Sequence, residues 1–151
     1  FGGGVGLVAC CDIAIGTPAA KFALTESKLG LLPAVISPYV IDAIGPRQAR
    51  RWFATAELFD ADTAVHMGLL HAVVPAAEPD SGVERQVGFL LKAARAPSSQ
   101  DKALVRRVAA DHDRNRLDAD NAALIARLRV SDEGQEGLGA FLDKRKPRWH
   151  S

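Results

Sequence analysis

Three consecutive glycines, Gly2, Gly3 and Gly4, precede an apolar stretch of small residues. If that stretch forms a helix, the unpaired N–H groups of its first turn converge on one spot, and the positive end of the helix dipole faces the same way. Such a spot can bind a phosphate or stabilise an oxyanion that develops during a reaction. The structural alternative is that the glycines permit a tight turn and close packing of a helix on a sheet.

Glu26 is the second candidate for chemistry. It lies between Leu24 and Leu29 in a segment that, apart from Lys28, is otherwise apolar or small. A carboxyl group in such surroundings is partly withdrawn from water, which suits a residue that transfers protons. The alternative is a surface glutamate that pairs with Lys21 or Lys28.

A dinucleotide-binding fingerprint is also present, because residues 4–9 fit the pattern G-x-G-x-x-A and Glu26 lies 20 residues after Gly6. The strand-like residues 13–15 follow Gly6 too soon for the usual crossover helix, and Glu26 lies well beyond the expected strand end at Gly16. The pattern therefore favours a nicotinamide-dependent enzyme only weakly. No G-K-[ST] follows the glycines, which excludes a P-loop.

Neither a metal site nor a nucleophilic serine is indicated. The histidines lack metal-ligand spacing, the two adjacent cysteines lack a ligand partner, and the serines considered lack a G-x-S-x-G context. No cofactor is therefore expected, and the absence of a disulfide framework fits a reducing, cytoplasmic setting. The residues considered are His66, His71, His112, His150, Cys10, Cys11, Ser27 and Ser37.

Length and composition define the protein class. The 151 residues are enough for one modest domain, and 48% hydrophobic with 25% charged residues is typical of a globular protein. Nineteen basic and 18 acidic residues leave a net charge of +1, which gives no electrostatic basis for binding nucleic acid or a membrane surface. The longest uncharged apolar run, residues 29–41, contains two prolines and is too short to span a bilayer. The chain begins with Phe1 and not Met, so we expect a cut start.

Helices and strands alternate in the first half of the chain, and they position the glycine run and Glu26. The pattern predicts a glycine turn, a short buried helix to Cys11, a strand at residues 12–16 and another at 21–24. An apolar helix over residues 36–44 ends at Gly45-Pro46. The further expected elements are an amphipathic helix at 47–56, a helix capped by Asp60 or Asp62 and ending at Gly68, and a strand at 69–74.

The second half is predicted to be helical. Residues 76–82 combine proline, aspartate, serine and glycine and are the most linker-like part of the chain. Helices are expected after them at 83–95, 99–111 and 119–130, and Ser131 is expected to cap a last helix to about Lys144. The fold class is therefore α/β, followed by an all-α region.

The order and spacing of several short motifs resemble the enoyl-CoA hydratase/isomerase (crotonase) superfamily along almost the whole chain. The resemblance implies part of a spiral of ββα units at residues 1–75, followed by a helical, CoA-contacting trimerisation region at 76–151. It covers the C-terminal half, or somewhat more, of a typical member. The motifs are Gly2-Gly3-Gly4, Cys11-Asp12-Ile13, Ala20-Lys21-Phe22 to Glu26, Leu29-Gly30-Leu31-Leu32-Pro33, Gly45-Pro46-Arg47-Gln48-Ala49, Met67-Gly68-Leu69 to Val74, and residues 141–147.

The resemblance also implies roles for single residues. One of two backbone amides that stabilise a thioester enolate maps onto Gly3, and Gly2 maps to the substrate-binding segment. Each such donor typically contributes about 3 to 4 kcal/mol. Glu26 matches the second of two family glutamates, but the first falls on Gly6. This departure puts simple two-glutamate hydration in doubt.

Within the superfamily, residues 1–12 and 33–40 look most like methylglutaconyl-CoA and isohexenylglutaconyl-CoA hydratases, which also lack the first glutamate. The resemblance implies that water adds to a 2-enoyl-CoA, with Glu26 as the acid/base residue. Pro33 is expected to contact the substrate, and the amide of Ala34 to orient the water.

Phe141 and Lys144 match family positions that contact the nucleotide end of CoA, commonly from a neighbouring subunit. The resemblance therefore implies an acyl-CoA thioester as substrate and a homotrimer or dimer of trimers as the assembly. The basic residues 144–148 either hold phosphates or form a solvated tail.

Two alternatives to hydration stay open besides the nicotinamide enzyme. One is a Δ3,Δ2-enoyl-CoA isomerase that uses Glu26 alone. The other is an inactive truncated fragment or oligomerisation module, since the resemblance leaves out the segment that supplies the other oxyanion amide.

Overall fold

The computed structural model describes residues 1–150, with the side chain of Ala96 excepted. The chain divides into unit 1, Phe1–Glu84, and unit 2, from Arg85 onward. The boundary lies within helix α4, Pro79–Leu90. The boundary expected from the sequence, between residues 75 and 76, lies in the loop before this helix.

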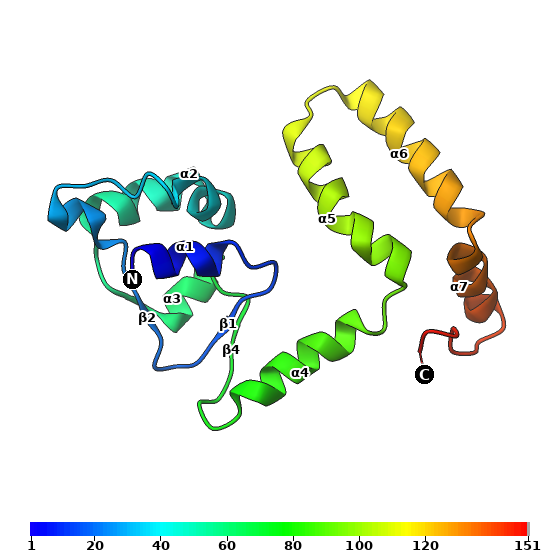
Figure 1. Cartoon of the computed structure of the whole chain (residues 1–151), viewed down its shortest axis with the longest axis horizontal. Helices are drawn as coiled ribbons and strands as arrows, with labels where there is room; N and C mark the ends of the chain where they lie inside the picture. Colours follow the sequence, from blue (N-terminus) through cyan, green and yellow to red (C-terminus); the bar gives the residue numbers. More distant parts are fainter. Residues whose placement is uncertain (151) are drawn as a thin grey trace. The chain divides into compact units, whose positions relative to one another are not determined.

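Unit 1 contains two small sheets. Strand β1, Ile15–Gly16, pairs in parallel with β4, Ala72–Val73. Strand β2, Lys21–Phe22, pairs antiparallel with β3, Phe59–Asp60. Residues from distant parts of the sequence therefore meet at both sheets, which is how a chain of short strands gains tertiary structure (Figure 1).

The helices of unit 1 pack beside these strands. Helix α1, Gly3–Ala9, packs against α2, Ser37–Thr55, and α3, Ala61–His66, follows β3 directly (Figure 1). The 3-10 helix η1, Thr25–Leu29, links β2 to the segment before α2. The Asp60 side chain caps α3 by accepting a hydrogen bond from Thr63 N–H at 2.9 Å. This hydrogen bond holds the pKa of Asp60 below its usual value.

A cluster of apolar side chains forms the core of unit 1. Phe22 and Phe59 stack across the β2–β3 pair with ring centroids 5.5 Å apart, and Trp52 of α2 lies 4.7 Å from the Phe59 ring. Leu24 and Val5 are almost completely buried. The core therefore includes the side chain directly after the glycine run, Val5, and the side chain two residues before Glu26, Leu24. The other large members are Val40, Ile44, Met67, Leu69 and Leu70.

The two helices expected at 36–44 and 47–56 are confirmed: both carry the label α2, but Gly45, with φ 76° and ψ 159°, is non-helical and separates them at a kink. Two other sequence predictions need correction in unit 1. The strand expected at 69–74 is confined to β4, because Leu69 N–H and Leu70 N–H both donate to the Ala64 carbonyl and close α3. Pro79 to Gly82 begin α4 and are not a linker, since proline is favoured in a first helical turn.

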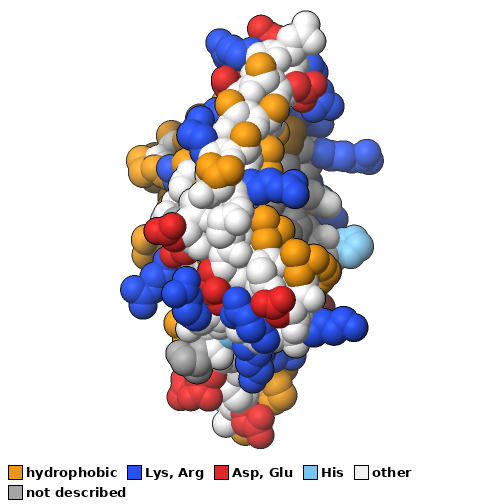
Figure 2. Space-filling view, turned by 90° about the vertical axis from the view of Figure 1, so that its right-hand side faces the viewer, with side chains coloured by type: hydrophobic (Ala, Val, Ile, Leu, Met, Phe, Trp, Pro, Cys, Tyr) orange, Lys and Arg blue, Asp and Glu red, His pale blue; other side chains and the backbone are white. Residues whose placement is uncertain are grey.

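Unit 2 is helical, as predicted. Helices α5, Arg95–Ala110, and α6, Arg114–Arg129, run antiparallel, and α7, Asp132–Leu142, follows after a short turn (Figure 1). Arg107 of α5 donates to the Asn121 side chain of α6. Many apolar side chains on these helices are exposed, and the face that includes α6 and α7 shows them between Lys and Arg side chains (Figure 2).

The predicted cap of the last helix is confirmed, because Ser131 Oγ accepts a hydrogen bond from Gly134 N–H at 3.1 Å. We expect Ser131→Ala to lower the free energy of unfolding by about 1 kcal/mol, since an N–H of the first turn loses its acceptor. Ser131→Gly should cost only a few tenths of a kcal/mol. Urea unfolding measures both variants, and equal stability of Ser131→Ala and wild type would contradict this role of the cap.

Candidate functional site

The start of helix α1 is tied to the end of strand β2. Gly2 N–H donates to the Ala23 carbonyl at 3.0 Å, and the Gly2 carbonyl accepts from Val5 N–H at 2.9 Å. Gly2 has a φ of 50°, a left-handed conformation that favours glycine. These bonds place the glycine run beside the segment that carries Glu26.

Gly3 is the first residue of α1 and is exposed. Its N–H precedes the first helical hydrogen bond, so it has no acceptor within the helix. A Cβ atom on Gly3 or on Gly4 would meet nothing within 4 Å in the part of the chain described. The space that a side chain at Gly3 or Gly4 would occupy is therefore open among the described residues, and packing does not explain glycine at these two positions.

Glu26 lies in η1 with its carboxylate against Gly2. Its Oε1 is 3.3 Å from the position that a Cβ atom on Gly2 would take. Its Oε2 is buried, and no residue in the range 1–150 gives it a hydrogen bond. The sequence left open a pairing of Glu26 with Lys21 or Lys28. The ion pairs within residues 1–150 do not include this pairing. A buried, unpartnered carboxylate oxygen is costly for stability and marks a candidate functional group.

The dinucleotide interpretation loses its structural basis. Glu26 belongs to a 3-10 helix, whereas a ribose-binding acid follows the end of a strand. Helix α1 has only seven residues, which is short for the crossover helix of that fold.

Pro33 and Ala34 lie between η1 and α2. Pro33 is buried, and its carbonyl accepts from Ser37 N–H at 2.9 Å. Ala34 is exposed, but its N–H donates to the Leu32 carbonyl at 2.8 Å. An amide that already donates is not available to a water molecule, so the role expected for Ala34 requires this turn to open.

Apolar side chains flank Glu26 on its C-terminal side, and they were missed as site residues. Leu32 and Val35 are 80% and 86% exposed. They belong to the uncharged apolar run 29–41, which is too short to span a bilayer. The signal for an apolar binding surface was therefore present in that run. The other exposed large apolar members are Leu29, Leu31, Tyr39 and Ile41.

Phe141 and Lys144 lie together in unit 2. Phe141 is 80% exposed in the last turn of α7, and Lys144 N–H donates to its carbonyl at 3.2 Å. Lys144 has a φ of 53°, an unusual value for a residue other than glycine. The two side chains thus come from one turn at the end of the helix.

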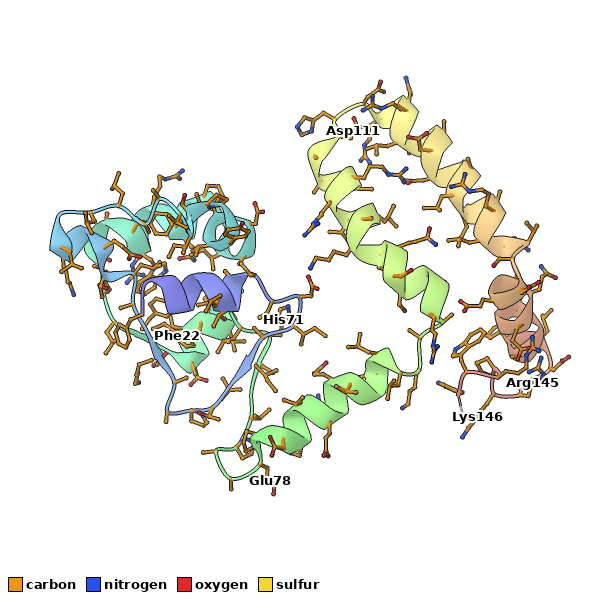
Figure 3. All side chains as sticks on the ribbon, in the orientation of Figure 1. Phe22, His71, Glu78, Asp111, Arg145 and Lys146 are labelled. Atoms are coloured by element: carbon orange, nitrogen blue, oxygen red, sulfur yellow. The ribbon has the colours of Figure 1, made fainter. Side chains whose placement is uncertain are left out.

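The basic segment after α7 is neither a simple solvated tail nor a set of free cations. Glu136 accepts hydrogen bonds from Arg145 Nη1 at 2.7 Å and from Arg148 N–H at 2.9 Å. The bond from Arg145 is the main cause that lowers the pKa of Glu136 to about 2. The Lys146 carbonyl also accepts a hydrogen bond from Arg145 Nη1 at 3.2 Å, and Figure 3 shows Arg145 beside Lys146 in the segment after α7.

The low pKa of Glu136 predicts a defined acid response. Because the pKa of Glu136 is lower in the folded state, the ionised carboxylate stabilises the fold at pH values above its ordinary pKa near 4.5. This stabilisation is lost as the pH falls toward about 2. We therefore expect Glu136→Gln to lower the urea midpoint at pH 7 and the difference from wild type to shrink between pH 4.5 and 2. A difference that is the same at pH 6 and at pH 2.5 would contradict this expectation.

The described residues contain neither a membrane-spanning helix nor a metal-binding cluster. Among residues 1–150, no helix is both long enough and apolar enough to cross a membrane. The same residues contain no group of three or more His, Cys, Asp or Glu side chains that could hold a metal ion.

Comparison with known proteins identifies the family. The family model described as enoyl-CoA hydratase/isomerase matches residues 1–151. A crystal structure of a putative enoyl-CoA hydratase/isomerase (crotonase) from Legionella pneumophila is 46% identical, with a TM-score of 0.91 over 99% of this chain and 57% of that one. The structure titled Pseudomonas aeruginosa AtuE is 38% identical, also with a TM-score of 0.91, over 99% of this chain and 58% of that one. The chain therefore belongs to the enoyl-CoA hydratase/isomerase family and has its α/β, crotonase-like fold.

Curated relatives agree with this assignment. The enoyl-CoA hydratase AKT6-1 of Alternaria alternata is 39% identical over 99% of this chain and 50% of its own length. The crotonyl-CoA hydratase of Syntrophomonas wolfei is 31% identical over 100% of this chain and 58% of its own length. The chain spans about half the length of the curated relatives that it matches.

Proposed function

We propose that the protein is an enoyl-CoA hydratase that adds water to the double bond of a 2-enoyl-CoA thioester. The observation that carries this proposal is the buried, unpartnered Oε2 of Glu26 beside the start of α1. A proton-transferring carboxylate next to an open backbone N–H matches the needs of a reaction through an enolate. Membership of the family supports the same chemistry.

In the proposed reaction, the Gly3 amide donates a hydrogen bond to the thioester carbonyl oxygen. The Glu26 carboxylate takes a proton from water while the water oxygen forms a bond to C3. The electrons of the double bond move to the carbonyl oxygen, where the Gly3 N–H stabilises the resulting enolate. Glu26 then returns the proton to C2, the carbonyl forms again, and the product is a 3-hydroxyacyl-CoA.

Isomerisation is the second candidate, because Glu26 of η1 is the carboxylate at this site and α1 adds none. Its sequence between Gly3 and Ala9 is entirely small and apolar. A single carboxylate can take a proton from C2 of a 3-enoyl-CoA and return it at C4, which moves the double bond without adding water. The same Gly3 amide would stabilise the dienolate.

The two candidates are distinguished by their products. The protein is incubated separately with a 2-enoyl-CoA and with a 3-enoyl-CoA, and the products are analysed by mass spectrometry. Hydration increases the product mass by one water, whereas isomerisation leaves the mass unchanged. Conversion of the 3-enoyl thioester without a hydrated product from either substrate would overturn the hydratase proposal.

The acyl group is proposed to be of the 3-methylglutaconyl type, on the strength of the resemblance in residues 1–12 and 33–40. The exposed apolar side chains at Leu32 and Val35 supply contacts for a branched chain. The value of kcat/KM for 3-methylglutaconyl-CoA should exceed that for crotonyl-CoA. A preference for the crotonyl thioester would overturn this part of the proposal and leave hydration intact.

The assembly is proposed to be a homotrimer or dimer of trimers in which Phe141 and Lys144 contact the nucleotide end of CoA. The exposed apolar side chains of unit 2 support an interface, and a groove of about 470 Å³ lined by Leu104, Val108 and Ile125 lies along α5 and α6. Light scattering coupled to size exclusion measures the assembly. A monomer without thioester turnover would favour the non-catalytic alternative.

A further inference from the structure

Gly6, in the middle of α1, forms a notch that the side chain of Ile36 fills. A Cβ atom on Gly6 would overlap Ile36 Cγ2 and come within 2.8 Å of Ile36 Cβ. Isoleucine is branched at Cβ, so its Cγ2 has little freedom to rotate away. Glycine at position 6 is therefore required by the Ile36 side chain, since Gly6 itself has ordinary helical geometry within α1.

The notch is one helical turn from the Glu26 carboxylate. Gly6 N–H donates to the Gly2 carbonyl at 3.3 Å, and four residues of helix advance about 6 Å. The carboxylate lies against Gly2 and the Ile36 side chain against Gly6. The side chains of Glu26 and Ile36 thus lie against successive turns of helix α1.

Ile36 also ends the segment that connects η1 to α2. Leu31 N–H donates to the Glu26 carbonyl at 3.0 Å, so the first residues of this segment are bonded to the backbone of Glu26. Between Gly30 and Val35, only Pro33 is buried. The insertion of Ile36 into the notch is therefore a principal anchor of the segment against α1.

We propose that Ile36 is a positioning residue for Glu26: it fixes the segment after η1 against α1 and fills the place where a side chain at position 6 would stand. The proposal rests on the proposed function, because it assigns Ile36 an effect on proton transfer by Glu26. It goes further by naming a packing pair, Gly6 and Ile36, that leaves no room for a side chain at position 6 of α1.

The packing pair is tested by a double-mutant cycle in urea unfolding. Gly6→Ala should lower the unfolding midpoint, because the added methyl group overlaps Ile36. Combining Gly6→Ala with Ile36→Ala should recover part of that loss. Gly4→Ala is the matched control in the same helix, since its methyl group meets nothing within 4 Å, and it should leave the midpoint unchanged or raise it. A double variant no more stable than Gly6→Ala would overturn the pairing.

Positioning is tested by kinetics on the folded variants. Ile36→Ala should lower kcat for the thioester at least tenfold while KM changes less than threefold. Ile36→Val keeps Cβ and Cγ2, the two atoms that meet Gly6, and should retain the wild-type kcat. A folded Ile36→Ala variant with wild-type kcat would overturn the positioning role and leave the proposed function intact. Wild-type protein that turns over no enoyl-CoA would overturn both.

Discussion

Replacement of Glu26 by Gln is expected to reduce kcat by about a hundred- to ten-thousandfold, the usual contribution of a positioned acid/base residue. The amide keeps the shape of the carboxylate but cannot accept and return a proton. Binding of the CoA thioester should change little, because the apolar contacts and the Gly3 amide are retained. Steady-state kinetics and calorimetry with a substrate thioester measure the two effects.

The matched control is Glu78→Gln, which makes the same change at an exposed glutamate in the loop before α4 (Figure 3). This variant should retain the wild-type kcat. A Glu26→Gln protein with unchanged turnover would refute Glu26 as the catalytic residue. Loss of thioester binding together with turnover would show instead that Glu26 has a structural or binding role.

The second large effect is expected for Leu24→Ala, which should lower the free energy of unfolding of unit 1 by about 3 kcal/mol. Leu24 is 1% exposed in the core, and truncation removes buried apolar surface and leaves a cavity. Because Leu24 directly precedes η1, the loss also loosens the support of the Glu26 segment. Urea unfolding followed by circular dichroism measures the effect.

Leu7→Ala is the control for this substitution, because Leu7 lies in α1 of the same unit and is 73% exposed. It should change the free energy of unfolding by less than about 0.5 kcal/mol. Equal losses in the two variants would mean that the core of unit 1 is not organised around Leu24.

The sequence predicted helices best where local chemistry determines them. Ser131 was identified as a cap from its type and position, and the hydrogen bond to Gly134 N–H confirms it. The strand at 69–74 was overestimated because its first residues bond to α3, a contact that periodicity does not reveal. Pro79 did not distinguish a linker from a helix start, because proline occurs both in loops and in first helical turns.

The candidate site was predicted as a set of residues but not as a packed arrangement. The motifs placed Gly2, Gly3 and Glu26 in one family site, and the structure brings the Glu26 carboxylate against Gly2. The sequence could not show that Ile36 fills the notch at Gly6, since the two positions are 30 residues apart in the printed sequence. It also could not show that the Ala34 N–H is bound to the Leu32 carbonyl.

The contacts of the basic segment after α7 could not be predicted from the sequence either. Its cations were weighed as phosphate ligands or as a solvated tail, and neither alternative included an internal acid. Glu136 lies on the preceding helix, nine residues before Arg145, and it binds both Arg145 and Arg148. Ion pairing across a turn depends on the path of the chain, which side-chain composition alone does not determine.

The central claim is that Glu26 and the Gly3 amide together enolise a CoA thioester, and exchange at C2 tests it most directly. Butyryl-CoA has no double bond to hydrate or move, so its C2 protons exchange with deuterated water only by enolisation. The account predicts deuterium at C2, detected by NMR, with the wild-type protein and almost none with Glu26→Gln. No exchange with the wild-type protein, or equal exchange with both proteins, would contradict the account.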